Sequence, residues 1–498
     1  MKVLVTGATG YIGGRLVPEL VAAGHEVRVL VRSPERLTDV PWRPQVDVAV
    51  GDLLDADATR KACRGMEVAY HLVHAMSARG AFEAREVAAA QNLADGAARG
   101  GVSRIVYLGG LHPNGVKLSR HLHSRVAVGE VFLRGVVPAI VLQAGIVIGS
   151  GSASFEMIRH LTDVLPYMPA PRWVRNRVQP IAIRDALHYL VQAASAPGDW
   201  NRTFDIGGPD VLRYGQMMNT YALEAGLRQR AIAALPVLTP WLASQWVHLV
   251  TPIPRNLAVP IIESLQHDCV VREHDIDGVI PPRAEGMLSY RQAVRLALRR
   301  ESAGEVPTSW RDSSISGIAS DPLPSDPEWA GTTVYTDERT IEGSDSPEEA
   351  WQRIEAIGGE NGWYSFPLAW AARGWFDRLI GGVGLRRGRR SAARLHTGDA
   401  LDFWRVESLD RGHSLRLRAE MRMPGRAWLE LRVDPSDSGN TYRQRAVFFP
   451  RGLTGRLYWW SLAPFHGVIF TGMASRIAGN APSRRSRTPA PNRQEGTR

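Results

Sequence analysis

Cysteine is scarce in this chain, and unbroken apolar runs are rare. Only Cys63 and Cys269 occur among the 498 residues, so we expect neither a disulfide framework nor a zinc centre, and no other metal site. Residues 231–262 form a notably apolar stretch, but prolines interrupt it, which leaves it too broken for a membrane-spanning helix. We interpret this stretch as part of a hydrophobic substrate lobe, with a membrane anchor as the alternative.

Acidic residues are fewer than basic ones: 50 Asp and Glu against 60 Lys and Arg give a formal net charge of +10. Much of the excess lies in residues 386–390 and in the tail from Pro482. We interpret both as solvated segments and expect no nucleic-acid partner; peripheral membrane contact is the alternative. No signal peptide precedes the first predicted strand, so we expect a cytoplasmic protein, alternatively one peripheral to the inner membrane face. The oligomeric state stays open.

The first fourteen residues carry the clearest motif. Residues 2–6 form a β-branched run typical of a buried strand, glycines follow at the spacing G-x-x-G-x-x-G, and helical periodicity begins at Arg15. In this context Gly7 permits a tight turn, Gly10 lets the backbone approach a pyrophosphate, and Gly13 lets the helix lie close to the strand. The helix N-terminus adds free N–H groups. The pattern predicts a dinucleotide site; a glycine turn without a ligand is the alternative.

The fingerprint Thr6-Gly7-Ala8-Thr9-Gly10-Tyr11-Ile12-Gly13 resembles that of extended and atypical short-chain dehydrogenase/reductases, which include epimerase/dehydratase-like and NmrA-like members. The resemblance implies an NAD(P) site whose pyrophosphate lies on the glycine turn. The implied cofactor-binding residues are Gly7, Thr9, Gly10, Tyr11, Ile12, Gly13, Arg32, Asp52, Leu53 and His74. Within this set, Asp52 and Leu53 match the Asp-Leu pair that contacts adenine in the family, and His74 begins the next cofactor-facing loop.

Arg32 bears on the choice of cofactor. It follows the second predicted strand, where an NAD-preferring site carries an acid for the ribose 2′-hydroxyl. A guanidinium suits a 2′-phosphate, so we predict NADP(H) in preference to NAD(H), with Arg36 or Arg15 as further partners. A solvated arginine at a strand end is the alternative.

Strands alternate with helices through the first 300 residues. Further strands are expected at 46–50, 68–73, 104–108 and 139–148, with helices at 57–64 and 83–99. This order predicts an α/β fold with a doubly wound parallel Rossmann sheet. The family resemblance adds a small substrate lobe, mainly within 150–290.

The predicted catalytic segment departs from the common pattern of the family, which has a serine after the fifth strand and Tyr-x-x-x-Lys on the next helix. Here Gly109 and Gly110 follow the strand, and the helix carries His121-x-x-x-Arg125. Positions i and i+4 share a helix face. The segment resembles a subgroup in which His-x-x-x-Arg replaces Tyr-x-x-x-Lys, which implies His121 as general acid and Arg125 as its partner. His112 and His123 are further candidates.

The C-terminal third differs in character. Residues 301–330 are rich in Ser, Pro, Gly and Asp and are interpreted as a linker, and 481–498 as a disordered basic tail. Residues 331–480 combine one strand, helices, an antiparallel meander and a long final helix. This order resembles the α+β helix-grip fold of polyketide-cyclase and START-like proteins, found fused to atypical reductases as an uncharacterised domain. The resemblance implies an apolar cavity, with candidate lining residues Trp363, Phe403, Trp404, Trp428 and Phe448; ordinary core is the alternative.

Two functions follow from these observations. The first is an NADP(H)-dependent oxidoreductase that acts on a small hydrophobic carbonyl or quinone-like substrate. The second is a non-catalytic NADP(H)-binding sensor or scaffold that regulates a partner. Only the first needs an acid beside the nicotinamide, so His121 and Arg125 distinguish them.

Overall fold

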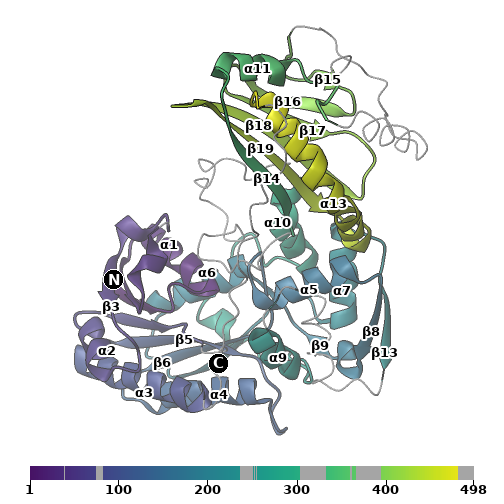
Figure 1. Ribbon diagram of the computed structural model, residues 1–498. Coiled ribbons are helices and arrows are strands. Elements are labelled where there is room, and N and C mark those ends of the chain that lie inside the picture. The colour runs from purple at the N-terminus through teal and green to yellow at the C-terminus, as the bar shows by residue number, and fades with distance from the viewer. Residues whose placement is uncertain are drawn as a thin grey trace, which may run out of the picture. The chain divides into compact units, whose positions relative to one another are not determined.

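The computed structural model describes residues 1–38, 40–74, 82–235, 251, 253, 255–302, 333–358, 362–365 and 394–480. The chain divides into two compact units, Met1–Gly331 and Thr332–Arg498 (Figure 1). The predicted linker 301–330 lies outside the described residues except for its first two, which end a helix. The basic segment 386–390 and the predicted tail 481–498 also lie outside them.

A seven-stranded parallel sheet forms the first unit, which confirms the predicted α/β class. Its strand order is β11-β6-β5-β4-β1-β2-β3. The strands are β1 (Lys2–Thr6), β2 (Glu26–Val31), β3 (Asp47–Val50), β4 (Val68–His71), β5 (Arg104–Gly110), β6 (Ala139–Ala144) and β11 (Arg202–Ile206). The order reverses between β1 and β4, and Thr6 at the end of β1 pairs with both Leu30 and His71. Ligands of such sheets bind at this reversal, beyond the carboxyl ends of the strands.

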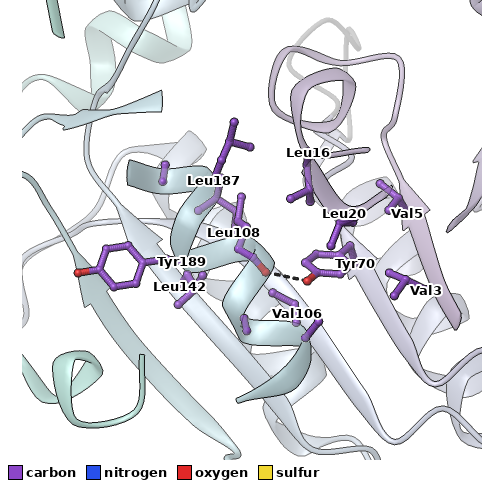
Figure 2. Packing of buried hydrophobic residues seen from close by; sticks show 14 of the residues in the cluster. Val3, Val5, Leu16, Leu20, Tyr70, Val106, Leu108, Leu142, Leu187 and Tyr189 are labelled. Atoms are coloured by element: carbon purple, nitrogen blue, oxygen red, sulfur yellow. Dashed lines mark hydrogen bonds between the residues drawn. The ribbon is translucent and has the colours of Figure 1, made fainter. Parts of the chain in front are cut away.

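Helices cover both faces of the sheet because its central strands are apolar on both sides. Val3 and Val5 of β1 point into one core, and Leu4 between them points into the other. The first core contains α1 (Tyr11–Ala22) and α6 (Ile183–Ser195), and the second contains α2 (Ala56–Cys63), α3 (Phe82–Gly100) and α4 (Arg120–Arg134). Figure 2 shows part of the first core, where the buried Tyr70 hydroxyl donates to the Leu190 carbonyl at 2.7 Å.

The predicted strand 139–148 is wrong as a single element. It breaks after Ala144, and β7 (Val147–Ile148) pairs instead with β10 (Ile181–Ala182) in a separate ribbon. The break occurs at Gly145, where a Cβ would lie 2.8 Å from the Gln179 carbonyl oxygen. A close crossing of two backbones therefore ends the strand, and apolar periodicity does not reveal such a crossing.

The residues beyond this break form a further cluster of apolar side chains, separate from the two cores on the faces of the sheet. It contains Phe155, Met217, Tyr221, Ile262 and Val294, all buried. Its helices are α5 (Ala153–Val164), α7 (Tyr214–Glu224), α9 (Arg255–Ser264) and α10 (Tyr290–Ser302). Two further ribbons pair β8 (Tyr167–Pro171) with β13 (Ala231–Leu235), and β9 (Arg177–Val178) with β12 (Leu212–Arg213). Residues 236–250 of the predicted apolar stretch lie outside the described residues.

The second unit is a mostly antiparallel sheet with order β14-β19-β18-β17-β16-β15, accompanied by two described helices. The elements are β14 (Tyr335–Gly343), α11 (Pro347–Glu355), β15 (Ala400–Leu401), β16 (Trp404–Asp410), β17 (Ser414–Ala419), β18 (Gly425–Ser436), β19 (Gly439–Pro450) and α13 (Gly452–Ile477). The five aromatic residues predicted to line a cavity are all buried. Trp363 and Phe403 stack with ring centroids 6.0 Å apart, and both belong to the core of this unit.

Two features are absent from the described residues. None of their helices combines the length and the apolar character needed to cross a membrane. Their histidines, cysteines and carboxylates form no group of three or more suited to a metal ion.

Candidate functional site

The turn between β1 and α1 depends on glycine for steric reasons. Gly7 has φ of 84°, and a Cβ there would lie 2.7 Å from the Leu72 carbonyl carbon. A Cβ on Gly13 would collide with the Gly7 carbonyl oxygen. Helix α1 begins at Tyr11, and its N-cap Gly10 has extended backbone and no side chain to cover the first N–H groups. The turn thus leaves a bare helix N-terminus at the sheet reversal, which fits a nucleotide pyrophosphate.

Tyr11 and Arg15 of α1 form an inward-facing pair. The Arg15 guanidinium carbon lies 4.2 Å from the centroid of the Tyr11 ring. Arg15 also donates to the carbonyl oxygens of Tyr11 at 3.2 Å and Ser150 at 3.1 Å, and only 3% of it is exposed. The prediction of Arg15 as a further partner of a 2′-phosphate is therefore wrong, because its guanidinium is held in the interior.

The residues predicted around ribose and adenine follow β2 and β3. The Arg32 side chain is 69% exposed, and its Nη1 lies 3.9 Å from Asp52 Oδ2. Arg36 is exposed just beyond it. Leu53 belongs to the core beneath α2 and α3, and its carbonyl accepts from Asn92 Nδ2 at 2.8 Å. Of the predicted adenine-contacting pair, Asp52 is therefore the member whose side chain faces solvent.

Arg125 of α4 fits against the end of β5. Its Nη2 donates to the Leu108 carbonyl at 2.6 Å. A Cβ at Gly110 would lie 3.2 Å from Arg125 Nε and 3.3 Å from its Cδ. Gly110 therefore leaves room for the guanidinium, and a larger residue at this position would press on it.

His121, one turn before Arg125, has both ring nitrogens engaged. Its Nε2 lies 2.7 Å from His74 Nε2, and its Nδ1 lies 2.9 Å from Ser264 Oγ on α9. His74 Nδ1 lies 2.7 Å from the carboxylate of Glu86 on α3, and Ser124 donates to the same carboxylate. The structure thus brings together the predicted residues His74 and His121.

This cluster lies beside the glycine turn. His74 directly follows Leu72 and Val73, and a Cβ on Gly7 would lie 2.9 Å from the Val73 nitrogen. The segment that carries His74 therefore packs against the turn expected to hold the pyrophosphate. The predicted cofactor-facing loop beyond His74 lies outside the described residues.

Burial determines the protonation of the cluster. It lowers the pKa of His121 well below 6.5, and the charges of His74 and Arg125 lower it further, while Glu86 raises it. Burial likewise lowers the pKa of His74, while the hydrogen bond that His74 donates to Glu86 raises it. Burial therefore disfavours the charged form of both imidazoles.

The other two candidate histidines lie apart from this cluster. His123 Nδ1 lies 2.8 Å from Glu83 Oε1, and its side chain is 63% exposed. His112 follows β5, and its Nε2 lies 3.3 Å from Gln143 Nε2. It helps to line a cavity of about 360 Å³ whose other polar lining includes Asn114, Arg125, Gln143 and Arg272.

Sequence reasoning missed Glu86 and Ser264. The sequence pattern could have indicated Glu86, because it is the carboxylate on the buried face of α3. The other residues of that face are Ala89, Ala90, Leu93, Ala94, Gly96 and Ala97. An acid on such a face needs a partner. Ser264 had no signal, because it lies 143 residues from His121 along the chain.

Two family models match the chain. One, described as NAD(P)H-binding, covers residues 7–127, and the other, a protein of unknown function (DUF2867), covers residues 329–473. The helix-and-sheet unit at the C-terminus therefore matches a family whose description assigns no activity.

Curated relatives match part of the chain. A 3β-hydroxysteroid dehydrogenase/Δ5→4-isomerase of Mycobacterium tuberculosis is 34% identical over 116 residues, which are 21% of this chain and 30% of that protein. A ceramide reductase of Caulobacter vibrioides is 30% identical over 199 residues, 39% of this chain and 61% of that protein. The chain thus spans 30% to 34% of the length of the first curated relatives it matches.

Among solved structures, the triphenylmethane reductase of a Citrobacter species, complexed with NADP(H), aligns with a TM-score of 0.47 and 17% identity over 60% of this chain and 100% of that chain. The glycine turn, the parallel sheet and the NAD(P)H-binding model agree with one another. The N-terminal unit of this chain is an NAD(P)H-binding Rossmann-like domain, similar to short-chain dehydrogenase/reductase and epimerase-like proteins.

Proposed function

We propose that the protein is an NADP(H)-dependent reductase of a small hydrophobic carbonyl or quinone-like substrate. The observation that carries this proposal is the position of the His121–Arg125 pair. The pair lies at the carboxyl edge of the sheet, and its partner His74 follows the segment packed against Gly7. When bound, the nicotinamide supplies hydride. The chain's own groups would then supply the proton and stabilise the negative charge on the carbonyl oxygen.

The class of substrate rests on the names of the relatives. Two of these names refer to a hydroxysteroid and a ceramide, both largely apolar molecules. We extend that chemistry to this chain as part of the proposal.

For the C-terminal unit we propose a helix-grip fold that holds or delivers the same molecule. The long helix α13 and the antiparallel sheet support this reading, since Tyr335 and Phe448 of the sheet each stack on Trp459 of that helix, at centroid distances of 5.4 and 5.8 Å. Peripheral membrane contact stays a proposal that rests on the basic residues of the sequence alone.

A non-catalytic NADP(H) sensor or scaffold is the second candidate, and one observation favours it. Both nitrogens of His121 are bonded to protein groups, so the ring has no free N–H to offer a substrate. A reductase would need the proton to leave through a neighbouring group. A sensor needs no such exit.

The deciding experiment measures NADPH oxidation over a panel of hydrophobic aldehydes, ketones and quinones. The reductase proposal expects turnover, and expects His121→Ala to lower kcat by about 10²–10⁴-fold with NADPH affinity nearly unchanged. His123→Ala is the matched control on the same helix, because His123 pairs with Glu83 at the surface. Absence of turnover, together with intact NADPH binding in both variants, would favour the sensor.

A further inference from the structure

Four side chains form one continuous hydrogen-bonded path across the first unit. Glu86 on α3 meets His74 Nδ1 at 2.7 Å, His74 Nε2 meets His121 Nε2 at 2.7 Å, and His121 Nδ1 meets Ser264 Oγ at 2.9 Å. We call Glu86, His74, His121 and Ser264 the proton chain. Beyond it, Ser264 Oγ lies 2.9 Å from the Pro260 carbonyl and 3.4 Å from Ser119 Oγ.

The geometry permits two proton arrangements that differ by one proton. In the unloaded arrangement, Glu86 is ionised and accepts from His74 Nδ1–H, His74 Nε2 accepts from His121 Nε2–H, and His121 Nδ1 accepts from the Ser264 hydroxyl. Each short contact then has one donor and one acceptor, and both rings are neutral.

The loaded arrangement holds one proton more. The Ser264 hydroxyl now points away from His121, for example toward the Pro260 carbonyl, which can only accept. His121 must then donate from Nδ1 to Ser264 Oγ, which leaves its Nε2 to accept from His74. His74 carries both protons and faces the Glu86 carboxylate, whose negative charge compensates the imidazolium.

The exit of the proton follows from the position of each group. His74 and His121 each have both nitrogens engaged. Glu86 at the other end is 6% exposed and also accepts from Ser124. The hydroxyl of Ser264 is the member that can turn from one acceptor to another without breaking the path.

We propose that the proton chain stores one proton and releases it through the Ser264 hydroxyl to the substrate oxygen. The inference rests on the proposed reductase function. As hydride reaches the carbonyl carbon and the C=O π bond breaks, the oxygen takes the Ser264 proton. Ser264 takes the Nδ1 proton of His121, and His121 Nε2 takes the Nε2 proton of His74. His74 ends neutral, and a bound nicotinamide would supply the hydride that balances the reduction of the carbonyl.

In this scheme Ser264 is the catalytic residue, and His121, His74 and Glu86 are positioning residues that act through it. The charged and titratable groups that face them are Arg125 on α4, His71 on β4 and Tyr107 on β5. Burial and the charge of Arg125 oppose the extra proton on His74, and Glu86 favours it. The stored proton is therefore weakly held, as a proton donor requires.

The first test needs no turnover. In the full chain with ¹⁵N-labelled histidine, imidazole NMR above pH 7 should show the proton of His74 on Nδ1 and that of His121 on Nε2. On acidification His121 should switch to the Nδ1 tautomer at the same midpoint at which His74 becomes cationic. Glu86→Gln should move that shared midpoint to lower pH. The same tautomer on both rings above pH 7, or two independent midpoints, would overturn the proton chain.

The second test separates the exit from the function. Ser264→Ala should lower kcat by about 10²–10⁴-fold with NADPH affinity unchanged, and Ser264→Thr, which keeps a hydroxyl, should retain most of the activity. Turnover that survives Ser264→Ala would overturn the exit through Ser264. A coupled tautomer switch in a protein that reduces nothing in the panel would overturn the reductase proposal and leave the proton store standing.

Discussion

His71 makes the first unit sensitive to acid. Its ring is 2% exposed and lies between Tyr107 and Phe132, with centroid distances of 5.8 and 5.2 Å. Its Nδ1 has no hydrogen-bond partner among the described residues. Burial lowers its pKa to about 4, so the folded protein holds it neutral where an unfolded chain would begin to protonate it.

The size of the effect follows from linkage. Between pH 6.5 and about 4 the unfolded state binds a proton at His71 that the folded state does not, so the free energy of unfolding falls as the pH falls through this window. At 1.36 kcal/mol per pH unit, the full loss is about 3 kcal/mol, and it is absent above pH 6.5. The lowered pKa values of His74 and His121 act in the same direction.

Hydrogen exchange of peptides from β5 reports this unit separately from the C-terminal one. Exchange at pH 7 and pH 5, corrected for the intrinsic rates, should show β5 opening more readily at pH 5. His71→Leu removes the titrating group and should flatten this dependence by about 2 kcal/mol across that interval. His123→Leu, at the surface, should leave the dependence intact. Equal pH dependence in the wild type and His71→Leu would refute the reasoning.

Three further perturbations test other parts of the molecule. Arg32→Asp should reduce the ratio of NADPH affinity to NADH affinity about fivefold in calorimetry, because an exposed charged contact contributes about 1 kcal/mol. Arg134→Asp, at the far end of α4, should leave this ratio unchanged. Gly110→Ser should lower the free energy of opening of the first unit by about 1 kcal/mol, as measured by hydrogen exchange. The same substitution in the Arg125→Ala variant, which lacks the guanidinium, should have no such effect. Gly343→Ala places a Cβ against the Ala478 carbonyl and should lower the free energy of unfolding by about 3 kcal/mol. Position 467 on α13 faces open space, so Gly467→Ala should raise the free energy of unfolding by about 1 kcal/mol. Thermal unfolding measures both changes.

Local patterns predicted the regular elements well. The order of strand, glycine turn and helix at the N-terminus is encoded within fourteen residues, and the alternation that follows gives the parallel sheet. The predicted long final helix is present as α13 (Gly452–Ile477). Such elements are predictable because their apolar periodicity lies within one or two turns of chain.

The site was predictable only in part, because its contacts span long separations. The i, i+4 spacing placed His121 and Arg125 on one face, but the space for Arg125 comes from Gly110 on another element. Ser264 reaches His121 across 143 residues. The lowered pKa of His121 follows from burial by several elements together, which no local pattern records.

The spread of the proton chain from His74 to Ser264 imposes an order on its assembly during translation. The glycine turn and the pairing of β1 with β2 and β4 can form once β4 has left the ribosome. Ser264 arrives only with α9, after the whole parallel sheet has been synthesised. A premature stop ahead of α9 would therefore leave every strand of the parallel sheet encoded and remove the terminal hydroxyl of the proton chain.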